Sequence, residues 1–384
     1  MKQRLSLLEP AWTGLQRLRG LTSGKRPLKR VIQRLRRLAG SKRRQSLARQ
    51  ESAIMGRTAG LEDIASFISA HPWIMKAPLV LVSQIERSGG TLLSQLFDDH
   101  PAIAAHPHEL KIGYPATEDW TTVEPEMSPG DAFRLLFEST VVKRMQLGYT
   151  KGARNVVRHR FLFAPYVQQR VFMALWNADP PASRRGVLDH YFSSYFNAWL
   201  NYNGTNHNGT LDGKRWITAF APRLAQKAAS VAGFFASYPD GRLIQIIRDP
   251  GTWYASAKNQ PRWAKVDASL DLLASAWRAS AEAILRNKAT HGDGVIILRF
   301  EDLVGNTEQT MQKLACMLGI DYAPILAEPT FNGLPIRANS SYSVEQSGVI
   351  RAPLARQAML SDSESHIIEA CSRSLYEEVA SRGA

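Results

Sequence analysis

Cysteine is scarce in this sequence, with only Cys316 and Cys371 among 384 residues. The two stand far apart and show no metal-ligand spacing, so the sequence supports neither a disulfide framework nor a zinc site. Long apolar runs are also lacking, because no stretch approaches the roughly 20 residues that a membrane-spanning helix needs. The N-terminal segment has no apolar core of the kind found in signal peptides. We therefore expect a cytoplasmic protein, with no metal suggested by the ligand pattern.

Acidic residues are nearly missing from the N-terminal segment. Residues 1–60 hold 16 Lys and Arg against 2 Asp and Glu, which equals the net charge of +14 of the whole chain. Residues 61–384 are therefore neutral by formal count, with 32 charges of each sign. The sequence thus divides into a basic arm, 1–60, and a main domain, 61–384.

Apolar residues in the arm recur at helical spacing between Lys and Arg residues, which predicts a short basic amphipathic helix. These apolar residues are Leu28, Val31, Ile32, Leu35 and Leu38. Such a helix is typical of proteins that adsorb to an anionic membrane surface, here the inner face of the membrane. Nucleic-acid binding is a second interpretation, disfavoured because no aromatic residues are interleaved with the charges. A solvated extension is the third.

Strand-like and helix-like segments alternate along the main domain. Short apolar runs predict strands over 78–85, 215–220, 242–248 and 294–300. Helical periodicity predicts helices over 61–71, 90–99, 222–237, 268–289, 306–319 and 361–380, and another from about 250. The alternation is typical of an α/β domain with a mostly parallel sheet. The aromatic-rich stretch 102–214 is expected to hold helices near 130–147, 160–176 and 186–201.

A loop with two glycines joins the first predicted strand to its helix. It reads "RSGGT" and begins at Arg87. Gly89 and Gly90 let the backbone approach a phosphate, Ser88 and Thr91 offer hydroxyl groups, and Arg87 supplies positive charge. Backbone N–H groups at such a turn bind anions. The loop therefore predicts a phosphate cradle, with a simple glycine turn capped by Ser88 as the alternative.

This loop lacks the lysine of ATP- and GTP-binding loops. The pattern G-x-x-x-x-G-K-[ST] needs Lys after its second glycine, whereas Thr91 follows Gly90. A nucleoside triphosphate is therefore a poor candidate ligand. A kinase-like phosphotransferase remains as an alternative function, as does a nucleic-acid-binding protein that acts through the basic arm.

A second strand–turn–helix segment reads "RLIQIIRDPGTWYASA" over residues 242–257. Arg248 ends the strand, and Pro250 suits the first position of the following helix. Ser256 lies eight residues after Arg248, about two turns into that helix. An arginine at the strand end and a serine on the helix can bind one phosphate together.

The two segments, in this order, resemble the sulfotransferase family, whose donor is 3′-phosphoadenosine 5′-phosphosulfate (PAPS). "RSGGTLL" is similar to the family's 5′-phosphosulfate loop, and "IIRDPGTWYASA" to its 3′-phosphate motif. "PTFNGLPIRANSSY", residues 329–342, resembles a loop that closes on the nucleotide in bacterial and carbohydrate-type members. Glu86 departs from the pattern, because the family usually has proline there.

The resemblance implies a P-loop-NTPase-like three-layer sandwich and transfer of a sulfuryl group from PAPS to an acceptor, without a metal. Segment 102–214 would then be a largely helical, acceptor-binding insertion. The implied donor-binding residues are Arg87, Ser88, Gly89, Gly90, Thr91, Leu92, Arg248, Ser256, Arg337, Asn339, Ser340 and Ser341. Arg87 would also stabilise the leaving phosphate. The implied acceptor is a glycan or glycolipid, with a small phenol or alcohol second.

The base that takes the acceptor's proton is left open between three residues. Glu109 occupies a place similar to the base of carbohydrate-type members. His108 is the next candidate because its ordinary pKa lies near neutrality, and His159 is the third. An ion pair between Glu109 and Lys111 on the surface is the structural alternative for Glu109.

Overall fold

The structure of this protein, a computed structural model, describes residues 60, 62–113, 116, 118–145, 160–203, 213–258, 260, 269–336, 348–351, 354–355 and 360–383. Residues 1–64 and 65–384 separate into two units. The predicted helix of the basic arm and His159 lie outside the described residues. The second unit carries the predicted sheet and both phosphate motifs.

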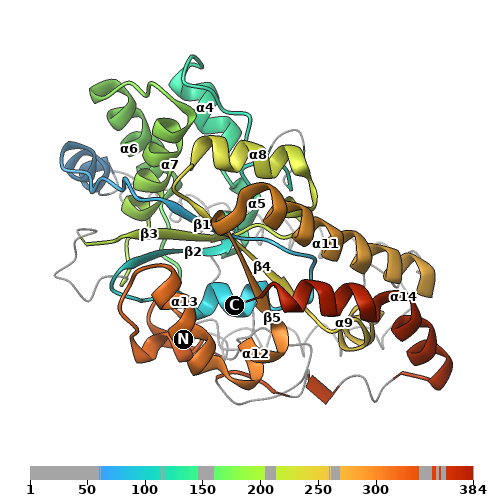
Figure 1. Cartoon of the computed structure of the whole chain (residues 1–384). Helices are drawn as coiled ribbons and strands as arrows, with labels where there is room; N and C mark the ends of the chain where they lie inside the picture. The colour runs from blue at the N-terminus through green and yellow to red at the C-terminus, as the bar shows by residue number, and fades with distance from the viewer. Residues whose placement is uncertain are drawn as a thin grey trace, which may run out of the picture. The chain divides into compact units, whose positions relative to one another are not determined.

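Five parallel strands form the central sheet, in the order β2-β3-β1-β4-β5 (Figure 1). They are β1 (Leu79–Val82), β2 (Ile103–Glu109), β3 (Trp216–Phe220), β4 (Arg242–Ile247) and β5 (Val295–Arg299). Both faces of β1 are buried, which explains its continuous apolar run. From β1 the chain turns toward β2 and β3, whereas β4 lies on the other side. The strand order therefore reverses between β1 and β4. In such sheets, ligands bind at this point, beyond the carboxyl ends of the strands.

Helices cover both faces of the sheet, giving three layers (Figure 1). On one face, residues such as Val82 and Ile246 share an apolar core with α3 (Gly90–Leu96), α12 (Phe300–Gly305) and α13 (Thr307–Met317). On the opposite face lie α8 (Ala228–Ser237) and α11 (Leu270–His291). Asn287 of α11 donates a hydrogen bond from Nδ2 to Gln245 Oε1 of β4 at 3.1 Å. The predicted P-loop-like α/β sandwich is confirmed.

A helical cluster stands between β2 and β3 in the sequence. It consists of α4 (Pro129–Leu136), α5 (Ser139–Met145), α6 (Pro165–Ala178) and α7 (Arg184–Ala198). Aromatic side chains of segment 102–214 could stack on a sugar, but four of them are buried: Trp120 against α8, and Phe161, Tyr191 and Trp199 in or beside the helical cluster. They stabilise the fold by packing, while Tyr202 is half-buried and Tyr114 lies outside the described residues.

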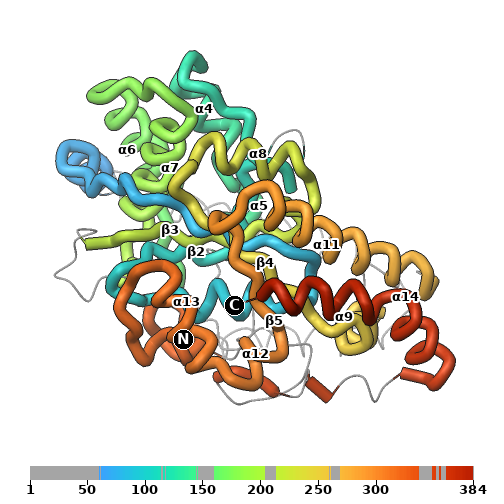
Figure 2. Tube along the Cα trace, viewed as in Figure 1, coloured from blue at the N-terminus to red at the C-terminus, as the bar shows by residue number. Residues whose placement is uncertain are grey.

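Further elements lie among the described residues outside these groups. They are α9 (Pro250–Ala257), β6 (Thr330–Phe331), β7 (Leu334–Pro335), α14 (Asp362–Ser381) and the 3₁₀ turns at Leu224–Gln226, Gly292–Gly294 and Pro324–Ala327. The C-terminal helix α14 packs along α9 and α11 (Figure 2). Its first turn is fixed by a capping box between Ser361 and Glu364.

The sequence predicts only helices in segment 102–214, and this prediction is wrong for strand β2. Its sequence "IAAHPHE" contains Pro107 and two histidines, so it shows no apolar run. The helix predicted over 222–237 is also partly wrong, because its first part is a 3₁₀ turn, Leu224–Gln226, and α8 begins only at Ala228. The strand predicted over 78–85 ends at Val82, where the glycine loop begins.

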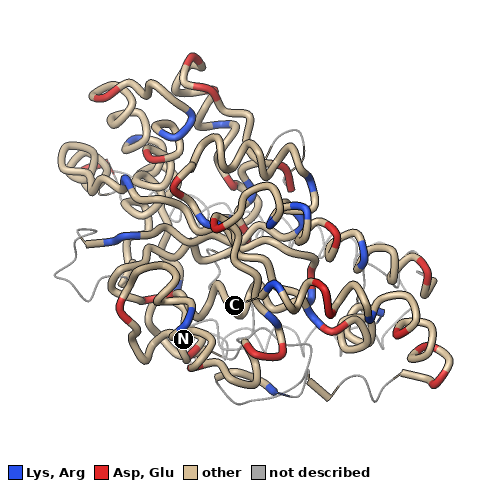
Figure 3. Tube along the Cα trace, in the orientation of Figure 1, with Lys and Arg blue, Asp and Glu red and all other residues tan. Residues whose placement is uncertain are grey.

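No helix among the described residues is both long and apolar enough to span a bilayer. Basic and acidic residues are interspersed along the described elements (Figure 3). This agrees with the balanced charge count of residues 61–384.

We predict that Leu93→Ala lowers the free energy of unfolding by about 2–5 kcal/mol, because Leu93 of α3 is fully buried in the core below the glycine loop. Equilibrium urea unfolding would measure the change. Leu272→Ala on α11 is the control, since this side chain is 48% exposed, and we expect a change below about 0.5 kcal/mol. Equal losses in the two variants would contradict the packing of α3.

Candidate active site

The loop after β1 has an unusual backbone. Arg87 and Gly89 both adopt left-handed conformations, with φ of 72° and 91°. This region is open to glycine but disfavoured for arginine, so the surrounding structure holds Arg87 in a strained conformation. Alternating left- and right-handed residues turn successive N–H groups toward one point, as in anion-binding nests.

Close packing explains the two glycines of this loop. A Cβ on Gly89 would lie 2.8 Å from the Phe300 ring of α12. A Cβ on Gly90 would overlap the side-chain amide of Gln84 and the Phe220 ring at the end of β3. Both positions therefore require glycine, and any side chain would push the loop away from the sheet edge.

Arg248 follows β4 and braces this loop from the neighbouring strand. Its side chain is buried, with 3% of the residue exposed. Nη1 donates to the backbone oxygen of Arg87 at 2.7 Å, and Nε donates to Thr252 Oγ1 at 3.1 Å. The guanidinium also stacks on the Phe300 ring, with Cζ 4.1 Å from the ring centroid.

The second predicted motif meets the first through its serine. Arg87 Nε donates to Ser256 Oγ at 3.1 Å, and Ser256 is buried on α9. The loop from β1 and the helix after β4 therefore share one polar site with two arginines. The structure brings together Arg87, Arg248 and Ser256, with Ser256 on Arg87 and Thr252 on Arg248; the predicted binding of one phosphate by Arg248 and Ser256 stays a prediction.

Carboxylates fix the backbone around this site. Asp249 caps α9 by accepting from Thr252 N at 2.9 Å, and its own N–H donates to Glu301 Oε1 at 3.0 Å. Glu86, the departure from the family pattern, pairs with Arg223 at 3.5 Å. The backbone oxygen of Glu86 accepts from Trp253 Nε1 at 2.8 Å. These contacts hold both strand ends in place.

Glu109 ends β2 on the same edge of the sheet as the loop. Its register partner is Phe220 of β3, whose ring packs on Gly90. The Glu109 side chain is 31% exposed and pairs with Lys111 Nζ at 3.2 Å. Glu109 thus lies at the same end of the sheet as the phosphate loop and is accessible from solvent. The ion pair with Lys111, which the sequence offers as a structural role for Glu109, is present.

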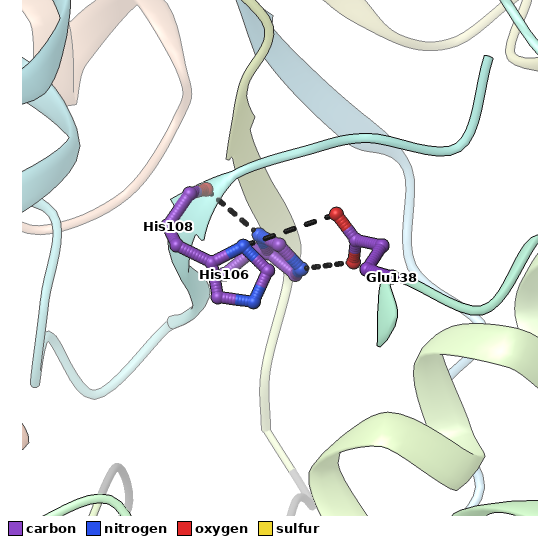
Figure 4. A group of neighbouring side chains, drawn as sticks. All are labelled: His106, His108 and Glu138. Atoms are coloured by element: carbon purple, nitrogen blue, oxygen red, sulfur yellow. Dashed lines mark hydrogen bonds and ion pairs between the residues drawn. The ribbon is translucent and has the colours of Figure 1, made fainter. Parts of the chain in front are cut away.

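His108 lies in a buried polar cluster with His106 and Glu138 (Figure 4). Since the two histidines are two positions apart on β2, both rings project from the same side of the strand. His106 Nε2 lies 3.0 Å from Glu138 Oε2, and His108 Nδ1 lies 3.8 Å from Glu138 Oε1. His108 Nε2 is 2.9 Å from the Tyr195 hydroxyl. Glu138 directly precedes α5 and belongs to none of the sequence motifs described above.

By type and separation, His106, His108 and Glu138 could hold a metal ion, because their donor atoms lie within 4.8 Å of one another. In the structure, His106 joins these residues by hydrogen bonds. Both ring nitrogens of His106 face acceptors, namely the His108 backbone oxygen at 3.0 Å and the Glu138 carboxylate. His106 thus forms a buried hydrogen-bonded pair with Glu138.

Glu138 anchors the chain segment that carries Glu109. Burial alone would raise the pKa of Glu138, but the charges of His106 and His108 and hydrogen bonds from His106 and Tyr191 lower it to about 2. Its Oε1 accepts from Lys111 N at 2.5 Å. The carboxylate thus holds the segment on both sides of Glu109.

The predicted closing loop falls largely outside the described residues. Arg337, Asn339, Ser340 and Ser341 are not described, but the β6–β7 hairpin before them is. Asp98, just beyond α3, accepts from Thr330 Oγ1 at 2.8 Å and from Gly333 N at 3.0 Å. Burial raises the pKa of Asp98 to about 6. The β6–β7 hairpin is therefore hydrogen-bonded to the segment just after α3, the helix that follows the phosphate loop.

A model of the sulfotransferase family matches residues 78–324, which include the sheet, the glycine loop and the Arg248 motif.

The chain belongs to the sulfotransferase family.

This confirms the predicted PAPS-dependent sulfotransferase and disfavours the kinase-like and nucleic-acid-binding alternatives. No curated protein matched this sulfotransferase. Among solved structures, it is similar to the sulfotransferase domain of the Synechococcus PCC 7002 olefin synthase at 18% identity, with a TM-score of 0.44 over 80% of this chain and 96% of that one.

Two further structures are similar to this sulfotransferase. The sulfotransferase domain from the curacin biosynthetic pathway is 15% identical, with a TM-score of 0.43 over 77% of this chain and 97% of that one. Retinol dehydratase in complex with retinol and PAP is 10% identical, with a TM-score of 0.33 over 81% and 85% of the two chains.

Glu138→Gln should lower the free energy of unfolding at pH 7 by about 3–5 kcal/mol, because it removes the buried carboxylate that pairs with His106 and accepts from Tyr191 and from Lys111 N. The depressed pKa of Glu138 stabilises the wild type above about pH 4.5, and this contribution is lost as the pH falls toward 2. The variant should lack that part of the acid dependence. Urea unfolding at pH 7, 4.5 and 3 would test both expectations.

Glu124→Gln provides the control, since Glu124 pairs with Arg184 and its side chain is 46% exposed. We expect a loss below about 1 kcal/mol from it. An acid dependence of Glu138→Gln identical to that of the wild type would contradict the ionised, buried Glu138.

Proposed function

We propose that this sulfotransferase moves a sulfuryl group from PAPS to a hydroxyl group of a glycan or glycolipid. One observation carries the proposal: the two strand-end motifs are joined into one site. Arg248 Nη1 donates to Arg87 O at 2.7 Å, and Arg87 Nε donates to Ser256 Oγ at 3.1 Å. A ligand with phosphates at both the 5′ and 3′ positions matches two adjacent basic motifs better than a single phosphate does.

The donor's 5′ end belongs to the loop after β1. The backbone N–H groups around Gly89 and Gly90 and the hydroxyls of Ser88 and Thr91 are the proposed ligands of the phosphosulfate, with Leu92 behind them. Ser88 Oγ supports this assignment, because it is buried and has no hydrogen-bond partner among the described residues. Buried hydroxyl groups rarely stay unpaired in the working state of a protein.

The donor's 3′-phosphate belongs to Arg248 and Ser256. Both are buried, Arg248 just before the N-cap of α9 and Ser256 near the end of this helix. Charge-assisted hydrogen bonds are strong in such surroundings. The undescribed residues Arg337, Asn339, Ser340 and Ser341 are proposed to cover the nucleotide.

Transfer proceeds in line. An oxygen lone pair of the acceptor forms a bond to sulfur, while the bond from sulfur to the bridging oxygen breaks and its electron pair goes to the 5′-phosphate. Arg87 stabilises the charge that grows on this leaving phosphate. The base takes the acceptor's proton, so that the products are the sulfated acceptor and adenosine 3′,5′-bisphosphate.

Glu109 is the base that the geometry favours. It is solvent-accessible at the sheet edge, two strands from β1, which corresponds to about 10 Å between strand axes. His108 is 4% exposed, and its ring nitrogens are engaged with Glu109 O and Tyr195. His108 would need to break these bonds to accept a proton from a substrate.

The acceptor class and the basic arm are the finer parts of the proposal. A glycan or glycolipid follows from the similarity of segment 329–342 to the closing loop of carbohydrate-type members, and a small alcohol is the second candidate. Residues 1–60 carry the whole net charge, and an amphipathic basic helix there would place the enzyme on an anionic membrane surface.

Arg248→Ala should weaken binding of adenosine 3′,5′-bisphosphate by about 2–4 kcal/mol, because it removes a buried charged partner of the 3′-phosphate. Binding of adenosine 5′-monophosphate, which lacks that phosphate, should change much less. Calorimetry with the two nucleotides measures the difference. Equal losses for both would show that Arg248 acts only as a brace for the loop.

Glu109→Gln should slow sulfuryl transfer by about 10²–10⁴-fold and leave binding of the bisphosphate unchanged. The measurement is the rate of PAPS consumption with an acceptor that the wild type uses, alongside calorimetry. His108→Ala is the comparison variant. An active Glu109→Gln together with an inactive His108→Ala that still binds the bisphosphate would transfer the role of base to His108.

A further inference from the structure

Gln84 is a buried glutamine at the start of the phosphate loop, two residues beyond β1. Only 1% of the residue is exposed. Neither Nε2 nor Oε1 of its side chain forms a hydrogen bond with any residue that the structure describes. The sequence patterns of the loop begin after Gln84, so they assign no role to it.

The backbone around Gln84 is held rigidly. Ser83 N donates to Ile244 O of β4 at 2.9 Å, and the Gln84 backbone oxygen accepts from Arg223 N at 2.9 Å. The side chain therefore projects from a fixed strand end and not from a mobile turn.

The amide of Gln84 lies directly against Gly90. A Cβ on Gly90 would overlap Gln84 Nε2 and the Phe220 ring. The glycine thus leaves the space that the amide occupies, at the point where the loop passes into α3. This places a side-chain N–H₂ group beside the backbone N–H groups of the proposed phosphosulfate site.

An unpaired buried amide is costly, because the hydrogen bonds that it loses to water on folding are not replaced. Ser88 Oγ is a further unpaired polar atom in the same loop. These three atoms are closed to bulk solvent, so a group that accepts from Gln84 Nε2 and Ser88 Oγ has to sit inside the loop. The nearby Arg87 guanidinium and the left-handed backbone of the loop favour an anion rich in acceptor oxygens over a cation or an apolar group.

We infer that the Gln84 carboxamide binds the donor, with Nε2 donating a hydrogen bond to an oxygen of the 5′-phosphosulfate. The inference rests on the proposed function. A neutral amide donates a directional hydrogen bond without adding charge to a site that already holds two arginines. Gln84 therefore orients the 5′ end of the donor, and Gly90 is the residue that makes room for this contact.

Calorimetry on the full chain tests this inference with two nucleotides. Adenosine 3′,5′-bisphosphate carries the 5′-phosphate, and adenosine 3′-monophosphate lacks it. Gln84→Met keeps the length of the side chain but removes both polar atoms. We expect it to weaken binding of the bisphosphate at least tenfold and to leave the affinity for the 3′-monophosphate within twofold of the wild type.

Two further variants keep the test decisive. Gln168→Met replaces another buried glutamine, on α6, and should change neither affinity. Gln84→Glu preserves size but places a carboxylate beside the phosphate, so it should weaken bisphosphate binding more than Gln84→Met does. It also replaces Gln84→Met if that variant does not fold.

The possible outcomes separate the two proposals. Unchanged bisphosphate binding in the Gln84 variants overturns the inference and leaves the proposed function standing. Equal losses for both nucleotides also overturn it, because the amide would then act on the fold. A wild type that does not bind the bisphosphate at all overturns the proposed function and the inference together.

Discussion

The hydrogen bond from Arg248 Nη1 to the Arg87 backbone oxygen, 2.7 Å long, is the contact on which the rest of the site depends. It joins the ends of two adjacent strands at the point where the strand order reverses. Because Arg248 also packs on Phe300 at 4.1 Å, the brace is anchored in the apolar core. Arg87 is thereby held in a left-handed conformation that it would not adopt alone, and its side chain reaches Ser256 of the second motif.

Charged residues around the site act mainly on the backbone. Glu301 accepts from Asp249 N at the start of α9, and Glu138 accepts from Lys111 N beyond the end of β2. These carboxylates fix the backbone of both segments. The two arginines lie together at the strand ends, while a third carboxylate, Glu109, is partly exposed at the same edge of the sheet.

The sequence predicts the parts of this enzyme that local chemistry determines. Apolar runs mark β1, β3, β4 and β5, and the glycine loop and the Arg248 motif each follow their strand as expected. Strand β2 escapes detection because Pro107 and two histidines interrupt its pattern, and its place in the sheet comes from pairing with β3. Glu138 lies 30 residues from His108 in sequence, so only the tertiary fold unites them. The proposed role of Gln84 rests on its contact with Gly90, which the spacing of residues in the sequence does not reveal. The roles of Arg337, Asn339, Ser340, Ser341 and the basic arm remain predictions.

In our proposal, the two strand-end motifs form one site for a nucleotide with phosphates at both the 3′ and 5′ positions. Calorimetric titration of the wild-type chain with adenosine 3′,5′-bisphosphate, adenosine 5′-monophosphate and ATP tests it most directly. We expect one site per chain with micromolar or tighter affinity for the bisphosphate, and much weaker binding of the other two nucleotides. Equal affinity for the bisphosphate and the 5′-monophosphate, or a preference for ATP, would contradict it.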